Sequence, residues 1–258
     1  MSKRTQAQAA PPVPPEQTLS LAWQAYSEGR FAEAEKACAT VVKVAESHAH
    51  AWHLRALAAL ALNKPKVALQ HLAHVKDAPE LLPGLAQARG RAFLALGRAE
   101  DALASFQETL GYKADDAATH HLLALAFLAK GDAAAARQYF KRTTLLDPEL
   151  GAAHYELGVL ALAAGDARQA VTAFTVAAQR MPMVAQVFNN LALAQQALED
   201  TPQAEVNLRK AIALDAQYAE AWFNLGLLLA ARGDAPQAAQ ARATAVSLNP
   251  ALAAVQSA

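Results

Sequence analysis

Small residues recur along the chain at a fixed interval of 34 positions. The first column of small residues consists of Ala22, Ala56, Gly90, Ala124, Gly158, Ala192 and Gly226. The second column is alanine every time, at Ala34, Ala68, Ala102, Ala136, Ala170, Ala204 and Ala238. A bulky apolar residue follows this alanine in five of the copies, as Leu72, Phe106, Phe140, Phe174 and Leu208. Small side chains on facing surfaces let helix axes approach, so the pattern predicts pairs of closely packed antiparallel helices.

The interval divides the chain into seven units without an insertion or a deletion. The units span residues 15–48, 49–82, 83–116, 117–150, 151–184, 185–218 and 219–252. Residues 1–14 are rich in proline and lack the apolar core that a signal peptide needs. We therefore interpret residues 1–14 as a disordered proline-rich leader and residues 253–258 as a short C-terminal tail.

The fifteenth position of each unit is suited to a turn between two helices. It is occupied by Gly29, Asn63, Gly97, Gly131, Gly165, Glu199 and Gly233. Glycine readily adopts the left-handed backbone conformation with which many helices end. At four of these turns an aspartate follows, as Asp132, Asp166, Asp200 and Asp234. An aspartate there can accept hydrogen bonds from the free amides of the next helix, so each unit is predicted to be a helix–turn–helix.

This pattern resembles the tetratricopeptide repeat (TPR) family over residues 15–252. The matching residues are the aromatic side chains of Trp52, Phe188 and Trp222, the pairs Leu157-Gly158 and Leu225-Gly226, the repeated alanine, and the closing Pro148, Pro182 and Pro250. The resemblance implies an all-α fold, a right-handed αα superhelical solenoid of seven TPR helix–turn–helix repeats. Its concave face would be lined mainly by the first helix of each unit.

Two departures from the family pattern lie in the second and third units. Arg55 and Arg89 occupy a column where leucine is usual, and we expect them to pair with Glu80, Glu100, Asp101 or similar neighbours, or to extend along the helix surface. Pro79 and Pro83 interrupt the junction between these units, where a bend or local mobility is expected. In the last unit Arg242 replaces the bulky residue, which is typical of a polar terminal repeat.

The resemblance also assigns a candidate partner-binding surface to particular positions of the first helices. This groove is predicted to be apolar along much of its length, with polar groups concentrated toward its C-terminal end. The candidate binding residues are Trp23, His53, Leu57, Arg91, His121, Leu125, Tyr155, Asn189, Asn190, Phe223 and Asn224. Asn190 and Asn224 share the sixth position of consecutive units and resemble the asparagine ladder with which the TPR arm of some sugar-transferring enzymes holds a peptide backbone. Ordinary polar surface is the alternative interpretation of both residues.

Composition and charge exclude several classes of protein. Hydrophobic residues make up 54% of the chain, too many for a disordered protein, and 68 of its 258 residues are alanine. Lysine plus arginine equals aspartate plus glutamate at 23 each, so there is no basic surplus for nucleic acid. No apolar run is long enough to predict membrane insertion. The single cysteine, Cys38, is interpreted as a small buried hydrophobic residue and fits a cytoplasmic protein.

No motif in the chain predicts catalysis or a cofactor. A phosphate-binding glycine loop, a G-x-S-x-G turn and an H-E-x-x-H pair are all missing from the sequence. His50 and His53 are spaced to face one side of a helix, but no third ligand stands nearby, so a metal site is not predicted. Arg55, Arg89 and Arg91 could bind an acidic tail, although the groove positions of the family's carboxylate-binding members are not reproduced.

The sequence therefore predicts a non-catalytic scaffold or adaptor that binds a protein or peptide in a concave groove. Two alternatives stay open. The chain could be the substrate-recruiting arm of a glycosyltransferase-type enzyme, or it could form homo-oligomers and act as an assembly protein.

Overall fold

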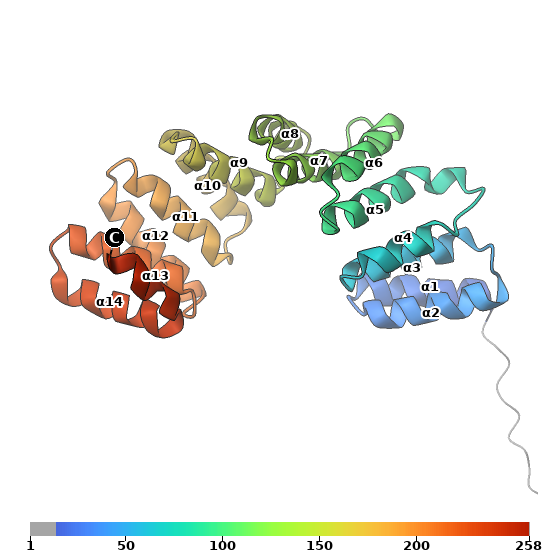
Figure 1. The fold of residues 1–258 in the computed structure, drawn as a ribbon, viewed down its shortest axis with the longest axis horizontal. Helices are drawn as coiled ribbons and strands as arrows, with labels where there is room; N and C mark the ends of the chain where they lie inside the picture. Colours follow the sequence, from blue (N-terminus) through green and yellow to red (C-terminus); the bar gives the residue numbers. More distant parts are fainter. Residues whose placement is uncertain (1–13, 258) are drawn as a thin grey trace, which may run out of the picture. The chain divides into compact units, whose positions relative to one another are not determined.

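Fourteen α-helices and two short 3₁₀ helices make up the described part of the chain, which contains no strand (Figure 1). The computed structural model describes residues 14–257. The leader expected over residues 1–14 lies outside the described residues except for Pro14. The helices are α1 (Pro15–Ser27), α2 (Phe31–Val44), α3 (Ala49–Ala61), α4 (Pro65–Leu72), η1 (Pro79–Leu81), α5 (Leu82–Ala95), α6 (Ala99–Tyr112), α7 (Ala117–Lys130), α8 (Ala133–Leu146), α9 (Gly151–Ala163), α10 (Ala167–Arg180), α11 (Ala185–Gln196), α12 (Thr201–Leu214), α13 (Ala219–Ala231), α14 (Ala235–Leu248) and η2 (Pro250–Ser257).

The chain forms two compact units, residues 1–132 and residues 133–258, which divide the fourth repeat between α7 and α8. Within each unit every helix packs against the helix that follows it in the sequence. The first helices of successive repeats also contact one another, α1 to α3 to α5 to α7 in the first unit and α9 to α11 to α13 in the second. Each unit therefore has a layer of first helices, which is the arrangement that the repeat pattern predicts.

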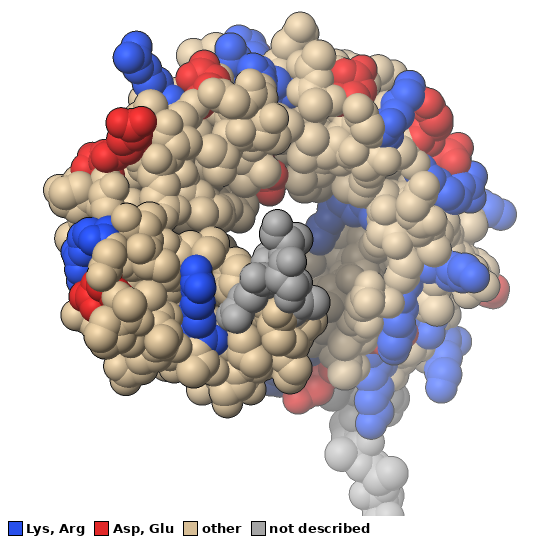
Figure 2. All heavy atoms as spheres, turned by 60° about the vertical axis from the view of Figure 1, so that its left-hand side comes forward, with Lys and Arg blue, Asp and Glu red and all other residues tan. Residues whose placement is uncertain are grey.

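Charged side chains of both signs are interspersed over the face of the molecule shown in Figure 2. Uncharged residues separate most of them, in keeping with the equal numbers of basic and acidic residues. None of the helices in residues 14–257 is long and apolar enough to cross a membrane.

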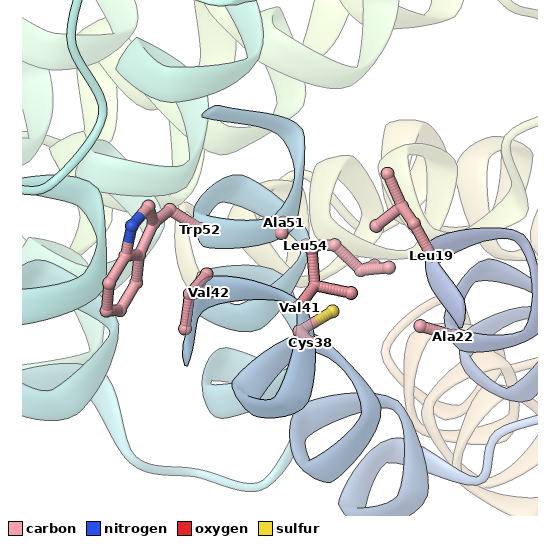
Figure 3. Close-up of a cluster of buried hydrophobic side chains, with 8 residues drawn as sticks. All are labelled: Leu19, Ala22, Cys38, Val41, Val42, Ala51, Trp52 and Leu54. Atoms are coloured by element: carbon pink, nitrogen blue, oxygen red, sulfur yellow. The ribbon is translucent and has the colours of Figure 1, made fainter. Parts of the chain in front are cut away.

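The buried core of the first unit is continuous across its first three helices (Figure 3). It contains Leu19, Ala22, Cys38, Val41, Val42, Ala51, Trp52 and Leu54. Cys38 is fully buried, as predicted, and burial raises the pKa of its thiol to about 12. The thiol is consequently protonated at neutral pH and contributes to packing as a small apolar group.

The small and bulky columns of the sequence meet inside the helix pairs. Gly158 on α9 faces Phe174 on α10 so closely that a β-carbon on the glycine would lie 2.6 Å from the ring atoms Cδ1 and Cε1. Phe174 is fully buried. In the sixth repeat Ala192 and Leu208 belong to one buried cluster instead. The sizes are matched in the fifth repeat, as Gly158 with Phe174, and in the sixth, as Ala192 with Leu208, whereas the fourth repeat combines Ala124 with the fully buried Phe140.

All seven turns within the repeats have the predicted left-handed residue. The backbone angle φ is positive at Gly29, Asn63, Gly97, Gly131, Gly165, Glu199 and Gly233. In each turn the next residue donates its backbone N–H to a carbonyl five positions earlier, as Asp200 does to Gln195 at 2.9 Å. Asp166, Asp200 and Asp234 then cap the following helix through a side-chain oxygen, as predicted. The turn geometry is therefore the same whether or not the residue is glycine.

Replacing Glu199 by glycine is expected to stabilise the chain by about 1 kcal/mol, because a left-handed conformation is costly for a residue with a β-carbon. Glu199 has φ of 63° in its turn. The gain would appear as a higher midpoint of urea unfolding. Gly165→Ala is the matched control, since Gly165 has φ of 77° and open space around it. That variant should lose stability, and a loss in Glu199→Gly as well would contradict strain at this position.

The junction between the second and third repeats is irregular, as its prolines predict. Helix α4 has 8 residues, whereas each of the other six second helices has 14. The chain then passes through Asp77, which has φ of 50°, and the 3₁₀ helix η1 that begins at Pro79. Helix α5 therefore starts at Leu82, one residue before the repeat boundary.

The final repeat uses an arginine where the second to sixth repeats use a large apolar residue. The side chain of Arg242 packs against Gly226, where an added β-carbon would lie 2.7 Å from its Cγ atom. The aliphatic part of the arginine covers apolar surface, and its Nε atom is buried with it. Helix η2 packs against α14 after this repeat, so the 3₁₀ segment from Pro250 follows the solenoid directly.

Candidate functional site on the first helices

A chain of side-chain hydrogen bonds joins the first helices of three consecutive repeats in the second unit. Asn224 on α13 donates from Nδ2 to Oδ1 of Asn189 on α11 at 2.8 Å. Asn189 in turn donates to Oδ1 of Asn190 at 3.1 Å. Asn190 donates to the hydroxyl oxygen of Tyr155 on α9 at 2.9 Å. We call these four residues the amide chain.

The buried member of the amide chain holds the two outer asparagines in place. Asn189 is only 3% exposed, and both ends of its amide are used within the protein. Asn190 and Asn224 are half-buried, so each retains hydrogen-bonding capacity toward solvent. Their amides can offer both a donor and an acceptor in a fixed orientation.

A shallow apolar pocket lies beside the tyrosine end of the amide chain. Its volume is ≈ 320 Å³ and it is lined by Ala152, Tyr155, Met181, Val184, Gln186 and Val187. The Tyr155 ring is held from behind by Phe174, with ring centroids 5.7 Å apart. The surface therefore combines an apolar recess with a row of oriented amides.

Two tyrosines and two glutamates shape the electrostatics of this surface. Burial and the nearby charge of Glu156 raise the pKa of the Tyr155 hydroxyl. Burial, followed by the charge of Glu220, raises the pKa of Tyr218 to about 12. Desolvation also raises the pKa of the half-buried Glu156 carboxyl. Both tyrosines are therefore neutral hydrogen-bonding groups at physiological pH.

The candidate residues of the first unit are less connected. Trp23 is 39% exposed and contacts Tyr26 edge-on, with ring centroids 6.0 Å apart. Leu57, Leu125 and His121 are half-buried and Arg91 is exposed.

Three candidates are placed differently from the expectation that they face a partner. His53 is buried, and its ring packs against the backbone at Gly84, where an added β-carbon would lie 2.9 Å from Cε1. Phe223 and Asn189 are buried as well. All three occupy the fifth position of their repeats, which is half-buried in Tyr155 and His121.

A sequence profile of the tetratricopeptide repeat family matches residues 19–80, 88–149, 121–185 and 189–253. Together these segments cover most of the chain. The chain belongs to the tetratricopeptide repeat family. Its fold class is accordingly the predicted all-α solenoid of seven helix–turn–helix repeats.

Solved TPR structures share this fold at low sequence identity. MamA from Desulfovibrio magneticus RS-1 is 21% identical, with a TM-score of 0.61 over 66% of this chain and 96% of that one. The C-terminal part of a TPR repeat-containing protein from Cytophaga hutchinsonii is 17% identical, with a TM-score of 0.68 over 90% of this chain and 95% of that one. YrrB, described as a TPR protein with an unusual peptide-binding site, is 16% identical, with a TM-score of 0.56 over 72% and 96%. A search of curated protein sequences finds no match.

Of the two arginines that depart from the TPR pattern, Arg89 makes an ion pair, as predicted, but with Glu108 on α6 and not with one of the three acidic residues named from the sequence. Arg55 lies over the Trp52 ring, with its Cζ atom 5.2 Å from the centroid. Arg55 is accounted for by the tendency of guanidinium groups to stack on aromatic faces. The partner of Arg89 stands on the facing helix, and distance along the sequence does not reveal which residue that is.

The predicted acidic partners of these arginines have other neighbours. Glu100 pairs with Lys130 at 2.8 Å, and Asp101 pairs with Arg98 at 2.7 Å. Glu80 lies 4.0 Å from the imidazole of His50. In the part of the chain that the structure describes, no group of three or more histidine, cysteine or acidic side chains could hold a metal ion.

Several residues of the TPR surface were not predicted because they lie outside the first helices. Met181 and Val184 line the pocket from the connection between α10 and α11. Tyr218 immediately precedes α13. The sequence did contain a signal for these residues. Large apolar side chains stand in the connections between repeats, which is unusual for a solvent-exposed turn.

Proposed function

We propose that this TPR protein is an interaction scaffold that binds an extended peptide segment of a partner on the first helices of its second unit. The observation that carries the proposal is the amide chain of Tyr155, Asn190, Asn189 and Asn224. It aligns amides from two repeats and a tyrosine hydroxyl from a third, and a polypeptide backbone presents N–H and C=O groups that such amides complement.

The fixed orientation of these amides favours a binding role over the alternative that they are ordinary polar surface. An ordinary exposed asparagine rotates freely and loses conformational entropy when it binds. Asn190 and Asn224 are held by Asn189 before a partner arrives, so less of that entropy remains to be lost. The neighbouring pocket beside Tyr155 offers room for one apolar side chain of the same segment.

Replacing both outer asparagines, as Asn190→Ala with Asn224→Ala, is expected to weaken peptide binding about thirtyfold, since two hydrogen bonds are lost. Each lost hydrogen bond is worth about 1 kcal/mol, and about 1.4 kcal/mol corresponds to a factor of ten. The measurement is fluorescence anisotropy with degenerate labelled peptide pools and the full chain. Circular dichroism would confirm that the variant keeps its helices.

Asn207→Ala is the matched control for this experiment. Asn207 lies on the second helix α12 and also donates a side-chain hydrogen bond, to Gln195 Oε1 at 2.8 Å. Its loss should leave peptide affinity unchanged. If the double variant binds as tightly as this control, the amide chain is not a binding element.

A further inference from the structure

The three first helices of the second unit are free of lysine and arginine. Helices α9, α11 and α13 together contain two acidic residues, Glu156 and Glu220, and no basic side chain other than His154. The second helices of the same unit do contain basic residues, including Arg168, Arg180 and Arg209. The first-helix surface therefore has a negative charge that its own helices do not balance.

Glu156 and Glu220 also have no partner elsewhere. Two other glutamates of the second unit do have partners: Glu205 pairs with Arg209 and Arg232, and Glu149 pairs with Arg180 at 2.7 Å. Within residues 14–257, the side chains of the half-buried Glu156 and the exposed Glu220 make no ion pair or hydrogen bond. A half-buried carboxylate without a partner is costly, and an approaching cation would remove that cost.

The surroundings of Glu156 are suited to a cationic side chain. The charge of Glu156 acts on the Tyr155 hydroxyl, and that hydroxyl accepts a hydrogen bond from Asn190. Glu156 and Asn190 share the sixth position of their repeats, on two first helices that contact each other. The charges of Glu220 and Asp215 act on Tyr218, which places more negative potential at the seventh repeat. Aromatic faces and carboxylates together attract guanidinium and ammonium groups.

We propose that the partner peptide carries a lysine or arginine whose cation pairs with Glu156 beside Tyr155 and Asn190. This inference rests on the proposed function and adds the charge of the partner to it. The same unbalanced carboxylates repel an acidic peptide, so the surface discriminates by charge as well as by backbone contacts. Glu220 adds to the negative potential along the surface and favours a second basic residue in the same segment.

The test uses three degenerate peptide libraries that differ only in one fixed central residue, which is arginine, glutamine or glutamate. Binding of each library to the full chain is measured by fluorescence anisotropy at low salt. The arginine library is expected to bind about tenfold more tightly than the glutamine library, and the glutamate library most weakly.

Glu156→Gln should abolish the preference for arginine over glutamine. The substitution removes an unpartnered charge from a half-buried position, so the helices are expected to stay folded. Glu199→Gln is the matched control, because Glu199 lies in an exposed turn of the same unit and should leave the preference intact.

Each outcome decides a separate point. Equal binding of the arginine and glutamine libraries would overturn the charge preference while leaving peptide binding in place. A preference that survives in Glu156→Gln would overturn the role of that carboxylate. If no library binds, both this inference and the proposed function fail.

Discussion

Gly158→Ala is expected to lower the free energy of unfolding by about 1–3 kcal/mol, the usual cost of overpacking a core. The added β-carbon would lie 2.6 Å from two ring atoms of Phe174, which is fully buried. An alanine normally favours a helix over glycine by about 1 kcal/mol, so the steric conflict must exceed that gain for the loss to appear. Urea unfolding followed by circular dichroism measures the change.

Gly111→Ala is the control for the same substitution without the conflict. Gly111 lies in helix α6 with no atom within 4 Å of an added β-carbon. This variant is expected to gain stability, which gives the two alanine substitutions opposite signs. If both variants are stabilised, close approach of α9 and α10 does not require glycine.

The double variant Gly158→Ala with Phe174→Leu separates a steric conflict from a general loss of packing. The sixth repeat already combines alanine and leucine in these columns, as Ala192 and Leu208. The combined loss should therefore be smaller than the sum of the two single losses, because leucine makes room for the β-carbon. Strictly additive losses would show that the two positions do not compete for the same space.

Acidification from pH 7 to about pH 5 is expected to cost the first unit about 2 kcal/mol through His71 alone. Burial, followed by the charge of Arg55, lowers the pKa of this imidazole to about 4. An unfolded histidine has a pKa of about 6.5, so between these values the unfolded chain binds the proton and the folded chain does not. The contribution of His71 to the free energy of unfolding is therefore fully present above the pKa of the unfolded chain, and it is lost as the pH falls from that value toward the pKa of the folded chain.

The neighbours of His71 define the size of this effect. Glu35 lies 3.9 Å from Nε2 and partly offsets the shift, whereas His74 acts in the same direction as burial. Burial also lowers the pKa of His53, which adds to the loss in acid. Urea unfolding at a series of pH values measures the dependence.

His71→Gln should flatten the pH dependence of unfolding, since the titrating group is gone. His50→Gln is the control, because His50 is nearly half exposed and its removal should leave the dependence in place. A free energy of unfolding that stays constant between pH 7 and pH 5 would show that His71 is protonated without cost.

The repeat frame could be predicted from the sequence because it depends on residue size and turn chemistry, which are local. The left-handed turns at Asn63 and Glu199 followed from position alone, although neither residue is glycine. The shortened α4 was only partly predictable. Pro79 indicated an interruption, but the end of α4 at Leu72 depends on packing between repeats.

The candidate site was harder to predict because the burial of a side chain depends on the packing of neighbouring helices. His53, Asn189 and Phe223 share the fifth position and are all buried. Position within a repeat indicates the face of a helix, whereas the depth of a side chain depends on the adjacent repeat. The role of Asn189 as a support for Asn190 and Asn224 could be recognised only from their hydrogen bonds.

Repeat proteins usually distribute their stability as local terms and terms between adjacent repeats. The amide chain adds a polar link that runs from Asn224 in the seventh repeat, through the sixth, to Tyr155 in the fifth. Removal of the Asn189 side chain is therefore expected to release Asn224 and to loosen Asn190 at the same time. The stabilities of these three repeats are coupled through side-chain hydrogen bonds as well as through the packing of adjacent helices.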